Sequence, residues 1–494
     1  MNYILSIDQG TTGTTAVLID ANTMNFVDKL NKEFPQIFPR PSWVEHNLND
    51  IWETVEYTVK QILKNNNITS DQISSIGITN QRETTCAFKK NGIPLSNAIV
   101  WQDRRTSEFC NSLSEKKDYI RKKTGLQLDS YFSGTKMNWL LSNNENVKKA
   151  YENKDLLFGT IDTYLLYKLT AGQSHKTEAS NASRTLLMDL ETTEWCDDLL
   201  EIFKVPRETL PEICDSFCNF GVTKDLSFLP DGIPITGILG DQQSALFGQA
   251  GLKSGDLKCT YGTGAFMLLN TGTEIKESQH GLLTTVAYKE NGVAYYALEG
   301  STYICGAAVQ WLRDNLEIIK NSSDIEDLAR KVKNLDEMEH VMFLPFFTGI
   351  GSPYWSSDAK ASILGLTRDT KKEHIARACL DGMALSINDL LQAMALDTNE
   401  EIKTLKVDGG AALNELLMNI QSTISQVEII RPKVIETTAY GAALASAIGA
   451  GMIKKEKVLE LWKKSDSFHG NKGEASHYEM KKEKWTHYIK ALFL

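Results

Sequence analysis

The chain has 494 residues, 42% of them hydrophobic, and its 53 lysines and arginines against 63 aspartates and glutamates give a formal net charge of −10. This length allows two or three domains with large cores, and the acidic balance argues against a nucleic-acid partner, because phosphate backbones attract a dense basic surface. No apolar run reaches the roughly 20 residues of a membrane span, and the start lacks the features of a signal peptide. Eight scattered cysteines without a CxxC pair indicate reduced thiols, so we expect a cytoplasmic protein.

Strand-like runs alternate with helical periods from end to end, which predicts an α/β fold. The first elements are strands at 3–8 and 16–20, followed by a helix at 48–64. A turn with the sequence Gly10-Thr-Thr-Gly13 separates the two strands. Glycines let a backbone approach a ligand closely, and the N–H groups and hydroxyls of such a turn can donate to phosphate oxygens. A single Gly/Thr turn is nevertheless more often an ordinary hairpin than a binding site.

Asp8 ends the first strand directly before this turn. Its carboxylate suits Mg²⁺ held through water beside a phosphate, because this ion keeps several waters when it binds. The alternative is that Asp8 only caps the turn. The sequence contains no GxxxxGK[ST] motif, and no GxGxxG follows a strand and opens a helix, so a P-loop is excluded and a Rossmann dinucleotide site is disfavoured.

Residues 77–85 form a polar cluster after a short apolar run, with Arg82 and Glu83 side by side. A guanidinium that donates and a carboxylate that accepts suit the vicinal hydroxyls of a polyol. The alternative is a surface ion pair of little energetic value. Trp101 follows, and it either packs against substrate carbons or belongs to the core.

Asp241 is the next candidate, because it follows a strand at 235–240 and starts a helix. The carboxyl end of a strand is the crevice position at which α/β proteins bind ligands. The alternative is an ordinary helix N-cap.

A second strand, Gly/Thr turn and strand at 257–270 repeats the pattern of the first hairpin. This internal echo predicts two related halves, and the Gly-punctuated stretch 248–255 marks a flexible boundary between domains at 1–250 and 251–494. Two such turns together could bind one polyphosphate. A third strand, turn and helix at 405–417 adds Gly410, where the chain can approach a flat ring or a phosphate, and Asn414, whose amide suits a base or ribose.

Taken together, these segments resemble the glycerol kinases of the FGGY carbohydrate kinase family over nearly the whole chain. The resemblance implies two ribonuclease H-like domains of the actin, Hsp70 and sugar-kinase superfamily around a central cleft, the first binding glycerol and the second the nucleotide. It also implies ATP-dependent phosphorylation of glycerol to sn-glycerol 3-phosphate. The segments that carry it, besides the DQGTT run from Asp8, are 77–85, Trp101, 131–136, 181–185, 240–243, 260–264, 281–285, 297–300, 352–355, 407–410 and 436–443.

The resemblance assigns roles residue by residue. Asp241 would be the general base, accepting the proton of the attacking hydroxyl, and Asp8 would organise Mg²⁺. ATP phosphates would contact the two Gly/Thr turns at Thr11, Thr12, Gly262 and Thr263, and the nucleoside would contact Gly306, Gln310, Gly410 and Asn414. Glycerol hydroxyls would be bound by Arg82, Glu83, Tyr131, Asp241 and Gln242, with Trp101 and Phe266 against its carbons.

This sequence departs from the family pattern at Thr15, where many relatives carry an arginine, so we expect weaker ATP binding than in those relatives. Loop 219–232 also lacks the segment through which bacterial relatives bind fructose 1,6-bisphosphate, and the histidine that some of them phosphorylate. Two rival functions remain open: a kinase of another small polyol or a pentulose, and a non-catalytic ATP-binding scaffold. Relatives of this kind are commonly homodimers or homotetramers.

Overall fold

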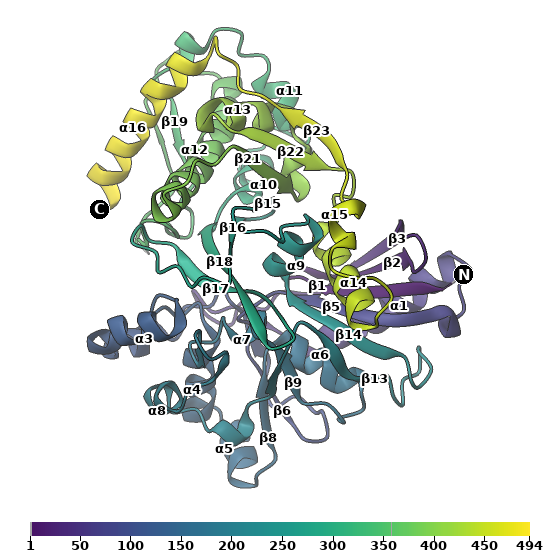
Figure 1. The fold of residues 1–494 in the computed structure, drawn as a ribbon. Helices are drawn as coiled ribbons and strands as arrows, with labels where there is room; N and C mark the ends of the chain where they lie inside the picture. The colour runs from purple at the N-terminus through teal and green to yellow at the C-terminus, as the bar shows by residue number, and fades with distance from the viewer. Residues whose placement is uncertain (1, 357) are drawn as a thin grey trace.

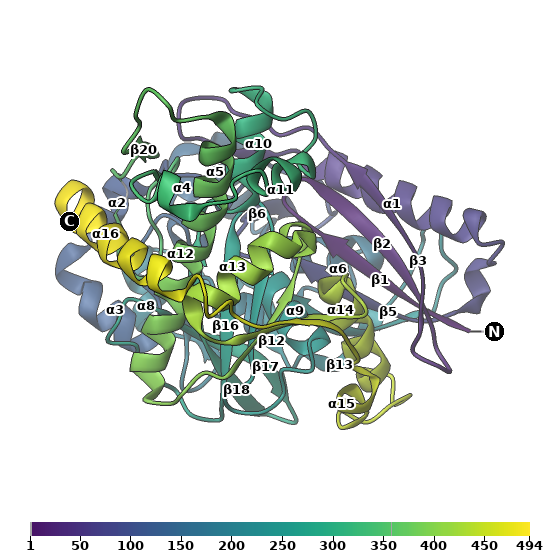
Figure 2. The same cartoon turned by 90° about the horizontal axis from the view of Figure 1, so that it is seen from above.

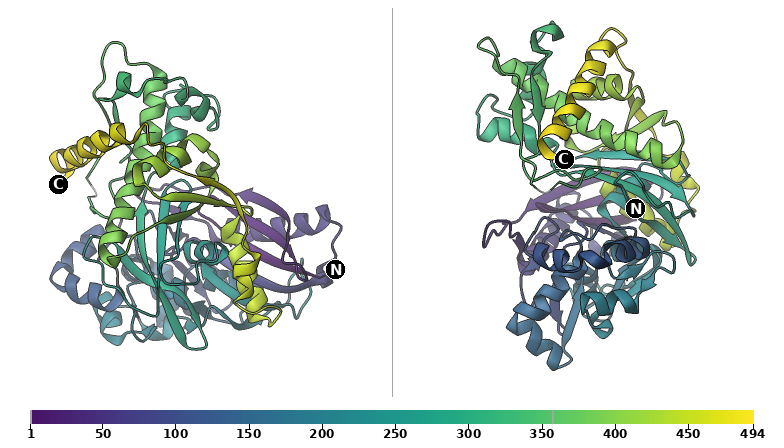
Figure 3. Two further views of the ribbon diagram at one scale, coloured as in Figure 1. Left: turned by 45° about the horizontal axis from the view of Figure 1, so that its top comes forward. Right: turned by 90° about the vertical axis from the view of Figure 1, so that its left-hand side faces the viewer.

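The computed structural model describes residues 2–356 and 358–494. Two mixed β-sheets form its centre, each flanked by helices, and the first half of the chain lies below the second half in Figure 3, right. The first sheet has six strands in the order β13-β14-β5-β1-β2-β3. Its strands are β1 (Tyr3–Gln9), β2 (Gly13–Asp20), β3 (Phe26–Glu33), β5 (Ile73–Asn80), β13 (Phe217–Val222) and β14 (Pro234–Gly240).

The second sheet has seven strands in the order β17-β18-β16-β15-β21-β22-β23 (Figure 1). They are β15 (Leu257–Tyr261), β16 (Ala265–Gly272), β17 (Leu283–Glu290), β18 (Val293–Thr302), β21 (Thr404–Asp408), β22 (Glu428–Pro432) and β23 (Lys464–Phe468). Ten short strands form two-stranded sheets at the periphery: β4 (Glu45–His46), β6 (Cys86–Lys89), β7 (Ala98–Ile99), β8 (Leu156–Gly159), β9 (Lys176–Glu178), β10 (Met188–Asp189), β11 (Glu194–Trp195), β12 (Glu212–Cys214), β19 (Met342–Leu344) and β20 (Ser362–Leu364).

Six strands of each sheet share one order and direction of pairing, as the paired hairpins in the sequence predict, and β17 adds a seventh strand at the edge of the second sheet. In the first, β1 pairs antiparallel with β2 and parallel with β5, while β14 continues the parallel part and β13 closes it antiparallel. In the second, β15 pairs antiparallel with β16 and parallel with β21, followed by parallel β22 and antiparallel β23. The predicted echo is therefore confirmed at the level of strand order and direction.

Sixteen helices accompany the sheets within the described residues. The predicted helix after residue 48 is α1 (Leu48–Asn65), whose buried positions Ile51, Val55, Val59 and Ile62 recur at helical spacing on the face packed against β2 and β3. The others are α2 (Ser107–Ser112), α3 (Lys117–Thr124), α4 (Ser133–Asn143), α5 (Glu145–Glu152), α6 (Ile161–Leu169), α7 (Ala179–Ala182), α8 (Asp197–Phe203), α9 (Asp241–Gly248), α10 (Gly306–Asp314), α11 (Asp324–Ala329), α12 (Lys372–Thr398), α13 (Glu415–Ser425), α14 (Thr437–Gly449), α15 (Lys457–Leu461) and α16 (Ala475–Phe493).

Helix α14 belongs to the second half of the sequence but packs on the first sheet. It lies against β14, β5 and β1 and beside α9, as Figure 2 shows from above. The approach is close because each contact has a glycine on one side. A Cβ at Gly77 of β5 would collide with the carbonyl group of Ala442 in α14, and one at Gly441 of α14 would collide with that of Ser244 in α9. The covering of the first sheet is thus completed by a segment beyond the predicted boundary at residue 250.

Helix α16 carries the C-terminus along the outer side of the second half (Figure 1) and is joined to α12 by a buried cluster of charged and polar groups. Asp381 of α12 pairs with Lys481 of α16, accepts from the hydroxyl of Tyr478 at 3.0 Å and lies 3.3 Å from Nε of Arg377. We call Arg377, Asp381, Tyr478 and Lys481 the α12–α16 cluster. Burial alone raises the pKa of the Asp381 carboxyl, but Lys481 and Arg377 bring it below its usual value.

Two sequence expectations concern features of the whole chain. All eight cysteines are free, as expected for reduced thiols. Within residues 2–356 and 358–494, no helix is both long and apolar enough to cross a bilayer.

Candidate active site

Arg82, Glu83 and Asp241 meet at the carboxyl ends of two neighbouring parallel strands. Arg82 and Glu83 follow β5, Asp241 is the first residue of α9 after β14, and Asn80 lies opposite Gly240 in the ladder. Arg82 is only 2% exposed and Glu83 1% exposed. The surface-ion-pair alternative is therefore wrong, because these charges are buried. Nε of Arg82 lies 3.2 Å from Oδ1 of Asp241.

Asp241 combines a perturbed carboxyl group with access to solvent. Its side chain is 26% exposed, and its Oδ1 accepts from the backbone N–H of Gln242 at 2.7 Å. Burial raises the pKa of the carboxyl above its usual value, while Arg82 and Lys258 offset part of the rise. The N-cap of α9 is Gly240, so Asp241 stands inside the helix rather than capping it. A reachable carboxylate beside a guanidinium has the properties of a general base.

Three aromatic side chains gather beside these charges. The ring of Trp101 lies 5.6 Å from that of Tyr131 and 6.1 Å from that of Phe266, both edge to face. Nε1 of Trp101 also donates to Oγ1 of Thr11 at 2.9 Å. Trp101 therefore joins the first Gly/Thr turn to β16, and it lies partly exposed at the edge of the core against which it packs.

Gln242 is oriented by a lysine that the sequence analysis did not single out. Nζ of Lys258, a buried residue of β15, donates to Oε1 of Gln242 at 2.6 Å and to Oγ1 of Thr260 at 2.9 Å. Burial lowers the pKa of Lys258, although neighbouring carboxyl groups, including Asp241, favour its charged form. This contact ties the α9 side of the site to the strand that leads into the second Gly/Thr turn.

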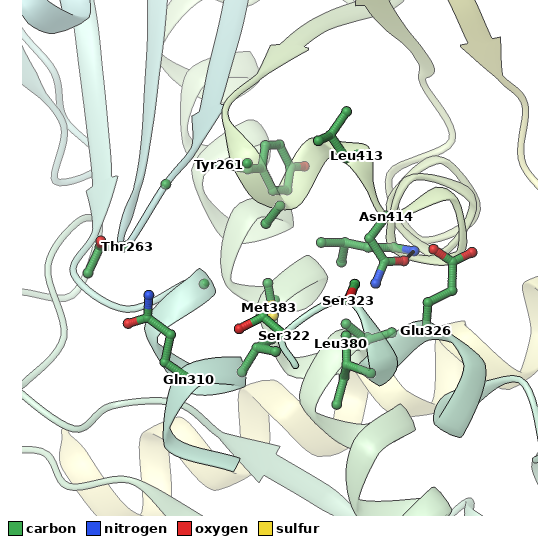
Figure 4. Close-up of a pocket in the computed structure, with 17 residues that line it drawn as sticks. Tyr261, Thr263, Gln310, Ser322, Ser323, Glu326, Leu380, Met383, Leu413 and Asn414 are labelled. Carbon is green, nitrogen blue, oxygen red and sulfur yellow. Dashed lines mark hydrogen bonds between the residues drawn. The ribbon is translucent and has the colours of Figure 1, made fainter. Parts of the chain in front are cut away.

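The predicted nucleoside residues and the second turn line one cavity of about 510 Å³. Gly262 and Thr263 come from the turn between β15 and β16, Gly306 and Gln310 from α10, and Gly410 and Asn414 from the segment between β21 and α13. In Figure 4, Thr263 and Gln310 lie at one side of the cavity and Asn414 at the other. Thr11 and Thr12 do not line this cavity. They lie in the turn between β1 and β2, in the first half of the chain.

Several residues that line the cavity were not predicted from the sequence. Ser322, Ser323 and Glu326 border the cavity beside Asn414 (Figure 4), and α12 adds an apolar wall. Glu326 accepts from the backbone N–H groups of Glu415 and Leu416, both at 3.1 Å, and so fixes α11 against the start of α13. Asn414 caps α13 with its Oδ1, which accepts from the N–H of Leu417 at 2.8 Å. The apolar residues of the lining are Val309, Ile325, Leu380, Met383, Ala411, Leu413 and Leu417, together with the ring of Tyr261.

Asp8 faces a locally acidic region. Burial, together with the nearby Asp241 and Glu436 carboxyl groups, raises the pKa of its carboxyl to about 8. A divalent cation would offset this repulsion, and carboxylate oxygen is a donor that Mg²⁺ accepts. Across the part of the chain that the structure describes, no group of three or more His, Cys, Asp or Glu side chains is arranged to hold a metal ion. The donor set therefore suits an ion whose remaining ligands are water and phosphate.

Comparison with known proteins points in one direction. Models of the N-terminal and C-terminal domains of the FGGY family of carbohydrate kinases match residues 3–248 and 257–450. A glycerol kinase of Bdellovibrio bacteriovorus is 49% identical over 94% of this chain and 94% of its own, and one of Bacillus subtilis is 46% identical over 99% and 98%. A solved Plasmodium falciparum glycerol kinase with ADP superposes with a TM-score of 0.89 at 36% identity, covering 100% of this chain and 99% of that one.

Proposed function

The chain belongs to the FGGY family of carbohydrate kinases, and from this premise we propose that it transfers the terminal phosphoryl group of ATP to glycerol, forming sn-glycerol 3-phosphate. The observation that carries the proposal is the contact between Arg82 and Asp241, 3.2 Å apart at the carboxyl ends of β5 and β14. A base and a guanidinium in one small site, walled by three aromatic rings, suit a short polyol.

The chemical step requires alignment and a base more than covalent catalysis. In our proposal Asp241 accepts the proton of the attacking terminal hydroxyl, which requires its carboxyl to be ionised. Glu83, Tyr131 and Gln242 bind the hydroxyls together with Arg82, while Trp101 and Phe266 contact the carbons. The Trp101–Tyr131–Phe266 group limits the room for a longer sugar and excludes water from the reacting hydroxyl.

The nucleotide occupies the 510 Å³ cavity in this proposal. Its apolar wall suits a flat base, with Asn414 and Gly410 at the base and ribose and Gln310 and Gly306 beside them. The Gly262–Thr263 turn and the Thr11–Thr12 turn bind the phosphates through N–H groups and hydroxyls. The hydrogen bond from Nε1 of Trp101 to Oγ1 of Thr11 supports this role, because it links the proposed glycerol-binding residues to the turn that would bind the phosphates.

Mg²⁺ would be held at Asp8, and it would neutralise charge on the phosphoryl oxygens during transfer. The fit rests on the acidic surroundings of Asp8 and on its position directly before the first turn. We also propose a cytoplasmic location, for which the eight free cysteines are an argument, and a homodimer or homotetramer, which light scattering after gel filtration would test.

The function is tested by measuring ADP release from MgATP with glycerol, dihydroxyacetone, a pentulose or no acceptor. We expect release that depends on glycerol, and a loss of kcat of about 10²–10⁴-fold in Asp241→Asn, which keeps the shape of the side chain but not its basicity. Release with the pentulose alone would make the protein a sugar kinase. ATP binding without release to any acceptor would favour a scaffold.

A further inference from the structure

Two buried charged residues lie behind the proposed glycerol site without a role in the mechanism above. Arg184 follows α7 in the first half of the chain, and Glu299 lies on β18 in the second half, and both are 0% exposed. They connect to Arg82 and Glu83 through ion pairs. We call Arg82, Glu83, Arg184 and Glu299 the inter-sheet cluster.

Glu299 engages both terminal nitrogens of Arg82. Nη1 of Arg82 donates to Oε2 of Glu299 at 2.5 Å, and Nη2 donates to Oε1 at 2.9 Å. Such a two-pronged contact fixes the plane of the guanidinium as well as its position. Nη1 also donates to Oε1 of Gln243 at 3.1 Å. Because both terminal nitrogens of Arg82 are hydrogen-bonded to Glu299, only Nε remains, and it lies 3.2 Å from Oδ1 of Asp241.

Arg184 acts on Glu83 in a comparable way. Its Nε donates to Oε1 of Glu83 at 2.6 Å, and its Nη2 donates to Oε1 of Glu299 at 3.0 Å. Glu83 has a φ of 60°, a left-handed conformation that is strained for a residue with a side chain. The hydroxyl of Ser133 donates to its carbonyl oxygen at 3.0 Å, so both ends of this strained residue are held.

The cluster contains two positive and two negative side chains, and it lies between the two sheets. A buried charge group of this kind is weak evidence for stability, because desolvation offsets much of the attraction between the charges. Glu299 keeps its charge here: burial alone raises the pKa of its carboxyl, but Arg184 and Arg82 bring it below its usual value. Orientation of the two residues in front of the cluster is therefore the property that these ion pairs supply.

We propose that Glu299 and Arg184 are positioning residues for the glycerol subsite, Glu299 fixing Arg82 against Asp241 and Arg184 fixing Glu83 in its left-handed conformation. The inference rests on the proposed function. It adds that Glu299, a residue of the second sheet, fixes the orientation of the side chains that bind glycerol at the end of the first sheet. Glycerol affinity should thus depend on Glu299 although Glu299 itself does not contact glycerol.

The test compares KM for glycerol, KM for ATP, kcat and melting temperature in Glu299→Gln, Glu299→Asp and Arg184→Lys. We expect Glu299→Gln to raise KM for glycerol about 30-fold or more, since truncation of a buried charge pair costs at least a factor of this order, with KM for ATP within about twofold. Glu299→Asp keeps the carboxylate and should recover much of the loss. Arg184→Lys keeps the charge but loses the planar guanidinium that bridges Glu83 and Glu299, and should raise KM for glycerol about tenfold.

The matched control is Asp381→Asn in the α12–α16 cluster, which also removes one buried carboxylate charge between cations but lies away from Arg82. It should lower the melting temperature and leave KM for glycerol unchanged. A Glu299→Gln protein that only melts earlier, as the control does, would overturn the proposal, and if this variant fails to fold, an unchanged KM in Arg184→Lys would do the same. Wild-type protein that releases no ADP with glycerol would refute the proposed function instead, so the two failures are distinguishable.

Discussion

Among the clusters of opposite charges that the described residues bury, one lies between the two sheets and one under the C-terminal helix. In the α12–α16 cluster, Asp381 is contacted by Arg377, Tyr478 and Lys481, which all belong to the two helices that it joins. In the inter-sheet cluster, Arg82, Glu83, Arg184 and Glu299 come from separate segments of both halves of the chain. Both clusters are almost completely removed from water.

The difference lies in their neighbours. Arg377 of the α12–α16 cluster touches Glu474, a partly exposed carboxylate at the N-cap position of α16, at 3.4 Å. Arg82 of the inter-sheet cluster instead touches Asp241, which is 26% exposed and follows β14 at the carboxyl ends of parallel strands. Buried charge alone therefore does not mark a catalytic site, because it serves helix docking equally well. The better indicator of function is a buried cluster that meets an accessible carboxylate at the carboxyl ends of neighbouring parallel strands, as Arg82 meets Asp241.

The largest effect that should separate the clusters is on stability. Lys481→Met keeps the length of the side chain but leaves Asp381 without its lysine partner, which should cost about 3 kcal/mol of folding stability. The midpoint of urea unfolding measures this loss, and KM for glycerol should not change. A variant with unaltered stability, or with a raised KM for glycerol, would contradict the separation.

The second prediction concerns pH. The pKa of the Asp241 carboxyl is raised by burial, so kcat/KM for glycerol should fall about tenfold per pH unit as pH drops below that raised value, because the base becomes protonated. The pKa of Asp381 is lowered by Lys481 and Arg377, so its stabilisation is present above the unfolded value of about 3.9 and is lost only as pH falls through the lower folded value. On acidification, catalytic activity should therefore be lost at a higher pH than the folded structure. Parallel measurements of kcat/KM and circular dichroism test this order, and coincident transitions would refute it.

A smaller effect is expected at Trp101, which joins the polyol side to the first turn. Trp101→Phe keeps an aromatic ring but removes the donor to Thr11, which should raise KM for ATP about three- to fivefold, the usual worth of one neutral hydrogen bond. Steady-state kinetics with either substrate varied checks this. Thr11→Ser retains the acceptor oxygen and is the control, so an equal rise in both variants would show that the hydrogen bond is not the cause.

The smallest effect is expected at Thr15. Thr15 lies directly opposite Asp8 in the β1–β2 ladder, and its hydroxyl accepts from Nδ2 of Asn31 at 2.8 Å. Directly paired residues share a face of the sheet, so Thr15→Arg would place a cation beside Asp8 and the phosphate turn. KM for ATP should fall about two- to threefold, while Thr15→Gln, long but neutral, should not lower it. An unchanged KM in Thr15→Arg would mean that the missing arginine does not weaken ATP binding.

Local features of the sequence predicted much of the fold and part of the site. The two hairpins, the strand before Asp241 and the pairing of Arg82 with Glu83 are visible in short segments, because strand and turn patterns are local. Arg184, Lys258 and Glu299 were not predicted as site residues, although two of them lie in segments that carry the family resemblance. The contacts of Arg184 and Glu299 within the inter-sheet cluster join residues 101 to 217 positions apart, and no local pattern encodes such a meeting. Lys258 reaches Gln242 over 16 positions, but across two separate elements, β15 and α9. Ser323 and Glu326 likewise reach the cavity only through the packing of α11 on α12 and α13.

The position of α14 has a consequence for how the protein is made. A ribosome that has synthesised every strand of the first sheet, the last of which is β14, has not yet produced the helix that covers it, because α14 begins at Thr437. The glycine-lined face of β5 and β14 and the apolar side of α9 therefore remain without their partner while about two fifths of the chain is still being added. A release factor or a nonsense codon acting anywhere in that interval would yield a truncated chain with an uncovered first sheet. Such a chain would be a substrate for chaperones and proteases rather than an independent glycerol-binding domain.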